Sequence, residues 1–445
     1  MNRTTLLLIA MLMSTGIATA QDPPQVASLT PPDAACDVDS GRVHELIVVF
    51  DRDMTEGGHS VCGGGPTFPT LDGPPRWKDK RTLILKVKLQ PDHDYRMSLN
   101  CPTAQSFRSA QGVPLVAVPW NFSTLPKDLP DAQRQRARNE KALALLIDAL
   151  DTRYSHRDLR VTDWEALWES AHADLLGAPT DAAFASRAAR ALEPTADLHL
   201  YFRCGERVFG TGRRAVDPLF RFARIGEQFT THAVGQNAVT GRSADGIGYL
   251  MIGSWSKDVD LDGVEADLAA LMDARAFVID ARPNAGGDER LALRIAAWFV
   301  EGRKVYAGHR VRRKDAEDGF GPVDDRVIRG NADARRRFTG PITVLTSRYV
   351  MSSNESFVLM LRQAADCTVV GQPTCGSSGN PQPCDLGNGV TVMVPSWQDL
   401  QPDGTCFEGT GIAPDVEVQV GPRDLESRDP ILERALAALR EKLAK

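Results

Sequence analysis

The sequence predicts a multidomain protein with a β-sandwich near its N-terminus, a helical segment after it and an α/β domain in the second half. Short apolar runs separated by Gly, Pro and Asp fill the region up to about Pro126, as is typical of strands joined by tight turns. From Asp131 to Leu192, apolar residues recur at helical spacing. From about Phe220 onward, strand-like and helix-like segments alternate, which indicates an α/β core.

The first twenty residues have the features of an export signal. A short basic start leads into the apolar run Leu6–Met13, and Ala18-Thr19-Ala20 offers a small-x-small cleavage site. We therefore expect residues 1–20 to be a signal peptide and the protein to be periplasmic or secreted. The apolar run is too short to span a bilayer, so no membrane insertion is expected.

The region 21–126 is expected to form the β-sandwich. Its clearest strands are Leu46–Phe50, Thr82–Val87 and Tyr95–Leu99. The element Phe50-Asp51-Arg52-Asp53-Met54 and the closing segment Trp120-Asn121-Phe122-Ser123-Thr124 resemble those of bacterial Ig-like modules. This resemblance implies an Ig-like β-sandwich for the N-terminal domain.

Six short segments of the remaining chain stand in a distinctive order. They are Asp197-Leu198-His199, Gly246–Leu250, Val278–Gly287, Ser352–Glu355, Val369–Thr374 and Gly411–Asp415. Together they resemble the motifs of peptidase family S41, the C-terminal-processing and tricorn-core proteases. The resemblance implies a helical cap over residues 127–205 and a catalytic core over residues 206–445. It also implies that the core has the ClpP/crotonase-like ββα-superhelix fold.

Ser352 is the candidate nucleophile. It follows the apolar strand Ile342–Thr346 and opens a helix that is predicted to continue through Leu361. The free N–H groups and the positive dipole end of a helix start can stabilise a developing oxyanion. Because Ser352-x-x-Glu355 also fits a capping box, the serine alone would be interpreted as an N-cap. The family motifs around it favour the nucleophile.

The candidate general base is His199, because the usual lysine is missing. Many S41 members use a Ser–Lys dyad, with the lysine shortly after the Val-Gly-x-x-Thr segment. Here Ser377 has that position, and there is no lysine between Lys314 and Lys442. The sequence resembles the branch in which a histidine is the base and a late glutamate orients it, which implies Glu408 as the orienting residue. A histidine suits this task because its ordinary pKa is close to neutral.

The oxyanion donors are expected to be the N–H of Ser353 and one N–H of the Gly286-Gly287 turn, where the missing Cβ permits close approach of a substrate. The sequence does not decide between the two glycines. Each candidate has a structural alternative. His199 lies in an alternating segment typical of a half-buried strand, and Glu408 has the character of a solvated loop carboxylate.

Composition and cysteine content limit the remaining function classes. A net charge of −6 argues against a nucleic-acid surface. Eight cysteines behind a signal peptide indicate an oxidising compartment, and the disulfides we expect are Cys62–Cys101 and Cys384–Cys406. Neither Cys-x-x-Cys nor His-Glu-x-x-His occurs, so no metal or cofactor is expected.

The sequence therefore predicts an exported serine-type endopeptidase that acts on peptides or proteins through Ser352, His199 and Glu408. The interval between Arg203 and Asp245 is too short for the PDZ domain that many relatives carry there. Two alternatives stay open. One is a non-catalytic ligand- or peptide-binding protein that retains the S41 fold, and the other is an envelope-binding protein that acts through the Ig-like module.

Overall fold

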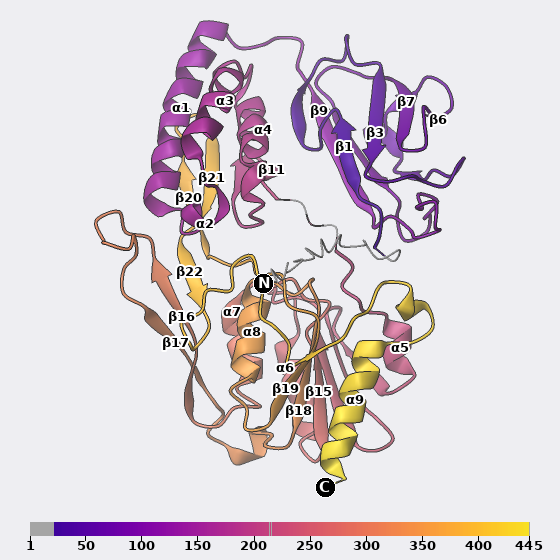
Figure 1. Ribbon diagram of the computed structural model, residues 1–445, viewed down its shortest axis with the longest axis vertical. Coiled ribbons are helices and arrows are strands. Elements are labelled where there is room, and N and C mark those ends of the chain that lie inside the picture. The colour runs from indigo at the N-terminus through magenta and orange to yellow at the C-terminus, as the bar shows by residue number, and fades with distance from the viewer. Residues whose placement is uncertain (1–21, 213, 215, 445) are drawn as a thin grey trace, which may run out of the picture.

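The computed structural model describes residues 22–212, 214 and 216–444, and the signal peptide expected over residues 1–20 lies outside these ranges. The chain forms two lobes (Figure 1). A β-sandwich and a helical cap lie side by side in the upper lobe, and an α/β core forms the lower one. None of the helices in the described ranges has the length and apolar character that a membrane span requires.

The N-terminal domain consists of two small β-sheets packed face to face. One sheet contains β1 (Val26–Thr30), β3 (Glu45–Phe50), β7 (Thr82–Lys88), β5 (Thr70–Leu71) and β6 (Arg76–Trp77). The other contains β2 (Ala35–Val38), β9 (Val118–Thr124), β8 (Asp94–Leu99) and β4 (Val61–Cys62). Alternate residues of β3 point into a shared apolar core, as expected for strands with one buried face. The assignment to the Ig-like class stays a prediction.

Only one of the two expected disulfides is found among the described residues. Cys62 and Cys101 form a disulfide within the sandwich domain. Cys384 and Cys406 are both free thiols, so the second expected disulfide is wrong for this structure. Cys384 lies in the cap sheet and Cys406 in a loop of the core, so the strand between them does not bring the two thiols together.

The cap is built from two distant parts of the chain. Its helices are α1 (Ala132–Arg153), α2 (Arg157–Arg160), α3 (Trp164–Leu176) and α4 (Asp181–Ala191). They cover a sheet of order β11 (Arg207–Gly210), β10 (Tyr201–Cys204), β21 (Val390–Pro395) and β20 (Pro381–Asp385). The late hairpin β20–β21 thus rises out of the core and completes the cap sheet (Figure 1).

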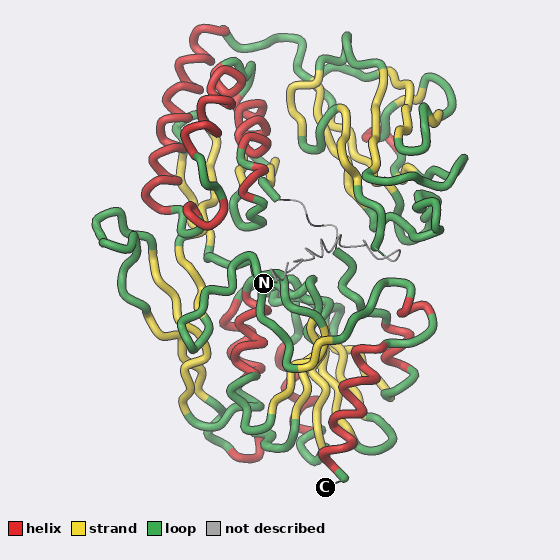
Figure 2. The backbone as a smooth tube through the Cα atoms, viewed as in Figure 1, coloured by secondary structure: helices red, strands yellow, loops and turns green. Residues whose placement is uncertain are grey.

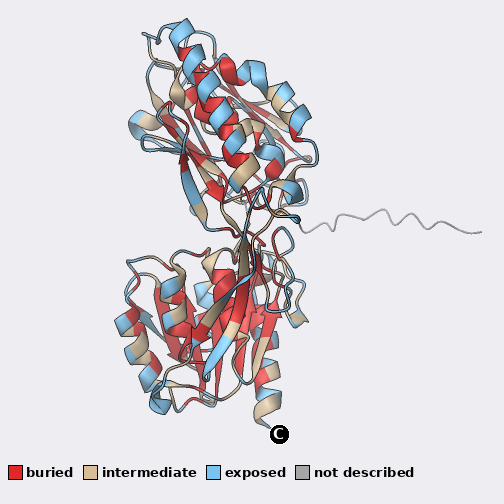
Figure 3. Cartoon of the chain, turned by 90° about the vertical axis from the view of Figure 1, so that its left-hand side faces the viewer, coloured by how far each residue is buried: buried red, intermediate tan, exposed pale blue. Residues whose placement is uncertain are grey.

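The core contains a seven-stranded sheet with helices on both faces. Its order is β12 (Thr230–Val234), β13 (Ala238–Arg242), β14 (Ile247–Ile252), β15 (Ala276–Asp280), β18 (Ile342–Thr346), β19 (Cys367–Gly371) and β23 (Val416–Glu417). The strands from β14 to β23 are parallel. Strands β14, β15 and β18 are buried throughout, as expected for parallel strands covered on both faces (Figure 3).

Two apolar layers attach the helices to this sheet. Helices α6 (Leu261–Ala270), α7 (Glu289–Ala296) and α8 (Ser353–Leu361) pack on one face, and α5 (Phe222–Gly226) and α9 (Pro430–Leu443) pack on the other. A separate three-stranded sheet of β17 (Asp324–Arg329), β16 (Arg303–Val311) and β22 (Trp397–Leu400) runs along the side of the core towards the cap (Figure 2). Single 3-10 turns occur at Gly65–Thr67, Glu193–Thr195, Ala334–Arg336 and Asp424–Glu426.

The predicted α/β architecture of the second half agrees with this sheet, and the superhelix description stays a prediction. The strand order places the C-terminal ends of β15 and β18 next to each other. Loops that follow parallel strands at such an edge form crevices where ligands commonly bind. The loops after β15 and β18 carry the Gly286-Gly287 turn and Ser352, and they meet the cap at this edge.

Candidate active site

Ser352 lies on a sharp turn between strand β18 and helix α8. Its backbone has φ 57° and ψ −134°, a combination that is uncommon for residues other than glycine. Such strain is found preferentially at functional sites, where the surrounding structure holds it in place. Here the N–H of Ser352 donates to the side chain of Glu355 at 3.0 Å and to the carbonyl of Ser377 at 2.9 Å. The turn thus fixes a serine at the start of a helix.

His199 contacts Ser352, as expected from the sequence. Its Nε2 lies 3.1 Å from Ser352 Oγ, although 153 residues separate the two positions. The histidine comes from the segment between the 3-10 turn Glu193–Thr195 and β10, so the cap supplies the base and the core supplies the serine. His199 is buried, with 9% of its surface exposed. With Nε2 as the acceptor for the serine hydroxyl, Nδ1 is the ring nitrogen that carries hydrogen.

The far nitrogen of His199 is occupied by Ser377 rather than by Glu408. His199 Nδ1 lies 2.9 Å from Ser377 Oγ. Among the described contacts of Glu408 there is none with His199. Its Oε2 accepts hydrogen bonds from Ser378 N at 3.0 Å and Ser378 Oγ at 3.1 Å. The expected direct contact is therefore corrected, because the Ser377-Ser378 turn lies between Glu408 and the base.

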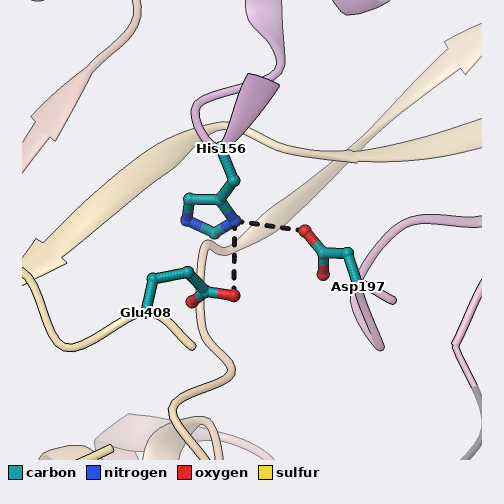
Figure 4. A group of neighbouring side chains, drawn as sticks. All are labelled: His156, Asp197 and Glu408. Carbon is teal, nitrogen blue, oxygen red and sulfur yellow. Dashed lines mark hydrogen bonds and ion pairs between the residues drawn. The ribbon is translucent and has the colours of Figure 1, made fainter. Parts of the chain in front are cut away.

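Glu408 faces a buried cluster of charged groups behind His199. Arg160 donates to Glu408 Oε1 at 2.5 Å, and His156 Nδ1 lies 3.5 Å from the same oxygen. The same His156 nitrogen is 3.1 Å from Asp197 Oδ2 (Figure 4). Asp197 also accepts from Tyr154 Oη at 2.8 Å. The attraction of Glu408 to two cationic partners explains why it turns away from His199.

Asp197 connects this cluster to His199. Its Oδ1 accepts the backbone N–H of His199 at 2.9 Å, while Oδ2 faces His156. The carboxylate is fully buried, and the hydrogen bond from His156 helps to hold the pKa of Asp197 below its ordinary value despite the opposing effect of burial. One anion therefore fixes the backbone of His199 and the ring of His156 at the same time.

The two buried histidines have pKa values displaced in opposite directions. Burial lowers the pKa of His199 below 6.5, and the positive charges of His156 and Arg214 add to this effect against the attraction of Asp197. Burial also acts to lower the pKa of His156, but Glu408 and Asp197 outweigh it and raise that pKa above 6.5. Environments that separate the pKa values of neighbouring groups are typical of acid–base sites. The surroundings therefore favour the neutral form of His199 and the charged form of His156.

His156, Asp197 and Glu408 also have the residue types of a metal site, and their ligand atoms all lie within 4.8 Å of one another. The donor set does not fit a bound cation. All four carboxylate oxygens already accept hydrogen bonds from protein groups. Arg160 and His156 supply positive charge at the place where a metal would lie. We interpret the cluster as an internal ion-pair network.

The Gly286-Gly287 turn packs directly against the nucleophile. A Cβ on Gly286 would lie 2.8 Å from Ser352 Cβ, and one on Gly287 would lie 2.1 Å from Trp255 O, so both positions require glycine. The N–H of Gly286 donates to Asn284 Oδ1 at 2.7 Å. The N–H of Gly287 and that of Ser353 have no acceptor among the described residues. These two N–H groups are therefore the candidate oxyanion donors of this turn.

Asparagine and tryptophan side chains hold this turn in place. Asn354 donates to the carbonyls of Ala281 and Asn284, at 2.9 and 3.0 Å, and accepts from Trp255 Nε1 at 3.0 Å. All these contacts are buried. The first turn of helix α8 and the glycine turn are therefore fixed to each other, which is what a preorganised oxyanion site needs.

Comparisons with known proteins agree with this geometry. Residues 246–418 match the model of peptidase family S41. The match includes the glycine turn, Ser352, Ser377 and Glu408. It begins after the cap helices, so His199 precedes it and lies outside. The resemblance of the core to peptidase family S41 is thereby confirmed.

Curated relatives match at low identity and over part of their length. The chain is 24% identical over 202 residues to the carboxy-terminal processing protease CtpB of Bacillus subtilis (strain 168), covering 45% of this chain and 39% of that protein. It is 26% identical over 149 residues to the chloroplastic carboxyl-terminal-processing peptidase 3 of Arabidopsis thaliana, covering 34% and 27%. The chain thus spans less than half the length of these relatives.

Solved structures show the same fold over most of their length. A putative peptidase from Parabacteroides merdae ATCC 43184 superposes with a TM-score of 0.58 at 23% identity, covering 68% of this chain and 96% of that one. Mature CPAF superposes with a TM-score of 0.50 at 13% identity, covering 68% and 97%. At these identities the likeness concerns the fold.

Proposed function

We propose that this protein is an exported serine-type endopeptidase in which Ser352 is the nucleophile and His199 the general base. The observation that carries the proposal is the 3.1 Å contact between Ser352 Oγ and His199 Nε2 at a strained helix start. A serine hydroxyl becomes reactive when a neighbouring base can take its proton. The protease names of the curated relatives support the same reaction class.

The arrangement supports hydrolysis in two steps. Ser352 Oγ attacks the carbonyl carbon of the scissile bond while its proton passes to His199 Nε2. The carbonyl oxygen, now negative, accepts hydrogen bonds from the N–H groups of Ser353 and Gly287. The imidazolium then gives its proton to the leaving amine, which departs and leaves an acyl-serine. Water, deprotonated by His199, hydrolyses this ester and regenerates Ser352.

Ser377 and Asp197 are proposed to share the role expected of an orienting carboxylate. The Ser377 hydroxyl accepts from His199 Nδ1 and fixes the ring, but it is neutral. The negative charge that stabilises the imidazolium comes from Asp197, which holds the backbone of the same histidine. Glu408 is proposed to act indirectly, because its hydrogen bonds to Ser378 hold the turn that carries Ser377.

A serine-reactive fluorophosphonate tests the central assignment. Wild-type protein should be labelled and should cleave peptides of a casein digest, and Ser352→Ala should lose both activities while remaining folded. The loss of an N-cap costs about 1 kcal/mol, which is too little to unfold a protein of this size. Ser170→Ala is the matched control, because it removes an exposed hydroxyl of helix α3 that donates to the carbonyl of Leu167. Equal labelling of Ser352→Ala and wild type would show that Ser352 is not the nucleophile.

A further inference from the structure

A positively charged side chain without an acidic partner lies next to the catalytic residues. Arg214 belongs to the connection between the cap and the core. Its guanidinium lies 4.2 Å above the ring of Tyr349, and Nη2 approaches the carbonyl of Arg348 at 3.4 Å. Nη1 contacts the sulfur of Met351, the residue directly before Ser352. Arg214 therefore lies against the segment that leads into the nucleophile turn.

Arg214 lacks a carboxylate partner among the described residues, although it is half-buried. Its Nε is buried and has no hydrogen-bond acceptor. Two arginines with more deeply buried side chains have two carboxylates each: Arg282 is paired with Asp280 and Asp429, and Arg326 with Glu289 and Asp399. Removing a charge from water without a partner is unfavourable. Accordingly, burial lowers the pKa of Arg214 below its usual range.

The position of Arg214 favours the substrate as the source of the missing acidic partner. Its Nη1 contacts Met351, the residue directly before Ser352, and its charge helps to lower the pKa of His199. A peptide whose scissile carbonyl lies at Ser352 Oγ passes close to the segment Arg348–Met351, which Arg214 contacts. Each Nη atom carries two N–H groups, so one on each remains beyond the contacts with Met351 and Arg348, and a planar guanidinium is suited to bidentate binding of a carboxylate.

We propose that Arg214 binds a carboxylate of the substrate close to the scissile bond, so that the enzyme prefers peptides with an acidic group at that place. This inference deepens the proposed function and rests on it. The carboxylate has two sources, an Asp or Glu side chain and the α-carboxylate of a C-terminus. Both have the same chemistry at the guanidinium, and the experiment below separates them.

The experiment measures the preference for a carboxylate in the full-length protein. A peptide that wild type cleaves in a casein digest is synthesised in matched forms, with Asp or Asn at each position near the cleaved bond and with a free or amidated C-terminus. We expect wild type to favour one carboxylate form by about 10- to 100-fold in kcat/KM, the factor expected for hydrogen bonds to a charged group. Preference for Asp over Asn identifies a side chain, and preference for the free acid over the amide identifies the C-terminus.

The variants Arg214→Gln and Arg214→Lys test the residue itself. Arg214→Gln should lose the preference, and Arg214→Lys should retain part of it because the charge remains. Arg136→Gln is the matched control, since it removes an exposed arginine of helix α1 and should keep the wild-type preference. Circular dichroism and thermal melting verify that each variant is folded.

The proposal is overturned if wild type cleaves the acidic and neutral forms equally, or if folded Arg214→Gln retains the full preference. Fluorophosphonate labelling of wild type separates this failure from failure of the proposed function. A labelled enzyme without carboxylate preference contradicts only the role of Arg214. A protein that is neither labelled nor able to cleave peptides contradicts the peptidase, and the role of Arg214 with it.

Discussion

Two buried histidines, His199 and His156, lie near the contact between cap and core, and their hydrogen-bond partners differ in charge. His199 is placed between the hydroxyl groups of Ser352 and Ser377, at 3.1 and 2.9 Å. His156 is placed between the carboxylates of Asp197 and Glu408, at 3.1 and 3.5 Å. Burial lowers the pKa of the first ring, whereas the two carboxylates outweigh burial and raise the pKa of the second.

The difference indicates that His199 is suited to proton transfer and His156 to holding the surrounding residues in place. A base must be neutral to accept a proton, and hydroxyl partners hold a ring in place without raising its pKa strongly. A supporting group benefits from charge, because charged hydrogen bonds are stronger than neutral ones. Asp197 belongs to both sides, since it binds the backbone of His199 and the ring of His156.

The same substitution at both histidines gives the largest expected contrast. His199→Gln should lower kcat by about 10⁴- to 10⁶-fold, as is found when the base of a catalytic triad is removed. His156→Gln should lower kcat by no more than about 100-fold, because a supporting residue acts only through the geometry of others. Both rates are to be measured on the same peptide. Similar losses in the two variants would abolish the distinction between base and support.

Removing Glu408 should affect stability more than removing Ser377. Glu408→Ala leaves Arg160 without its carboxylate partner and removes one of the two carboxylates beside His156, which is expected to cost about 3–5 kcal/mol in the free energy of unfolding. Urea denaturation measures this loss. Glu301→Ala is the matched control, because its ion pair with Arg337 is largely exposed and should contribute less than about 1 kcal/mol. An equally small loss in Glu408→Ala would contradict the ion-pair network.

Ser377→Ala should change the rate and leave the fold intact. The hydroxyl holds the ring of His199 through Nδ1, so its loss permits the imidazole to turn away from Ser352. We expect kcat to fall about 10- to 100-fold with KM little changed, since general-base catalysis contributes 10²- to 10⁴-fold and only part of it depends on this contact. Ser378→Ala is informative beside it, because that hydroxyl faces Glu408. Wild-type kcat in Ser377→Ala would show that another group orients the base.

The pH dependence of kcat/KM gives the smallest expected effect that distinguishes the roles of the two histidines. Because burial lowers the pKa of His199, kcat/KM should rise with pH through an ionisation below 6.5, the ordinary histidine value. The positive charge of His156 contributes to this lowering. In His156→Gln the ionisation should therefore move to higher pH. A profile of His156→Gln that coincides with wild type, or one that moves to lower pH, would disagree with the charge assigned to His156.

Sequence motifs predicted the residues whose local context is distinctive. Ser352 follows a buried strand and opens a helix, and the glycine turn follows another strand, so both could be identified from short segments. His199 was identified by family resemblance, and the structure brings it to Ser352. Ser377 was visible only as the residue that replaces a lysine. Its position opposite His199 could have been inferred from the need of the base for a hydrogen-bond partner.

The contacts within the charged cluster could not be predicted from sequence motifs in this way. The partners of His156 lie 41 residues away at Asp197 and far along the chain at Glu408, and no local pattern connects the three. Arg214 is distinguished by the absence of an acidic partner among the described residues. This absence can be recognised only once the surroundings of Arg214 are known. The cap was predicted as a continuous segment, whereas the hairpin β20–β21 joins it from the core. The pairing of strands that are far apart in the chain cannot be recognised from local sequence patterns.

The late hairpin also determines when the proposed catalytic centre can form during biosynthesis. Strand β10, directly after His199, gains its central neighbour only when β21 has been made, and Ser377 lies just before that hairpin. A chain that emerges from the ribosome or from an export channel N-terminus first lacks these residues until most of its length is available. Contacts between distant segments also form slowly. The proposed catalytic centre can therefore assemble only after nearly the whole chain has been delivered, which delays proteolysis until synthesis and transfer are almost complete.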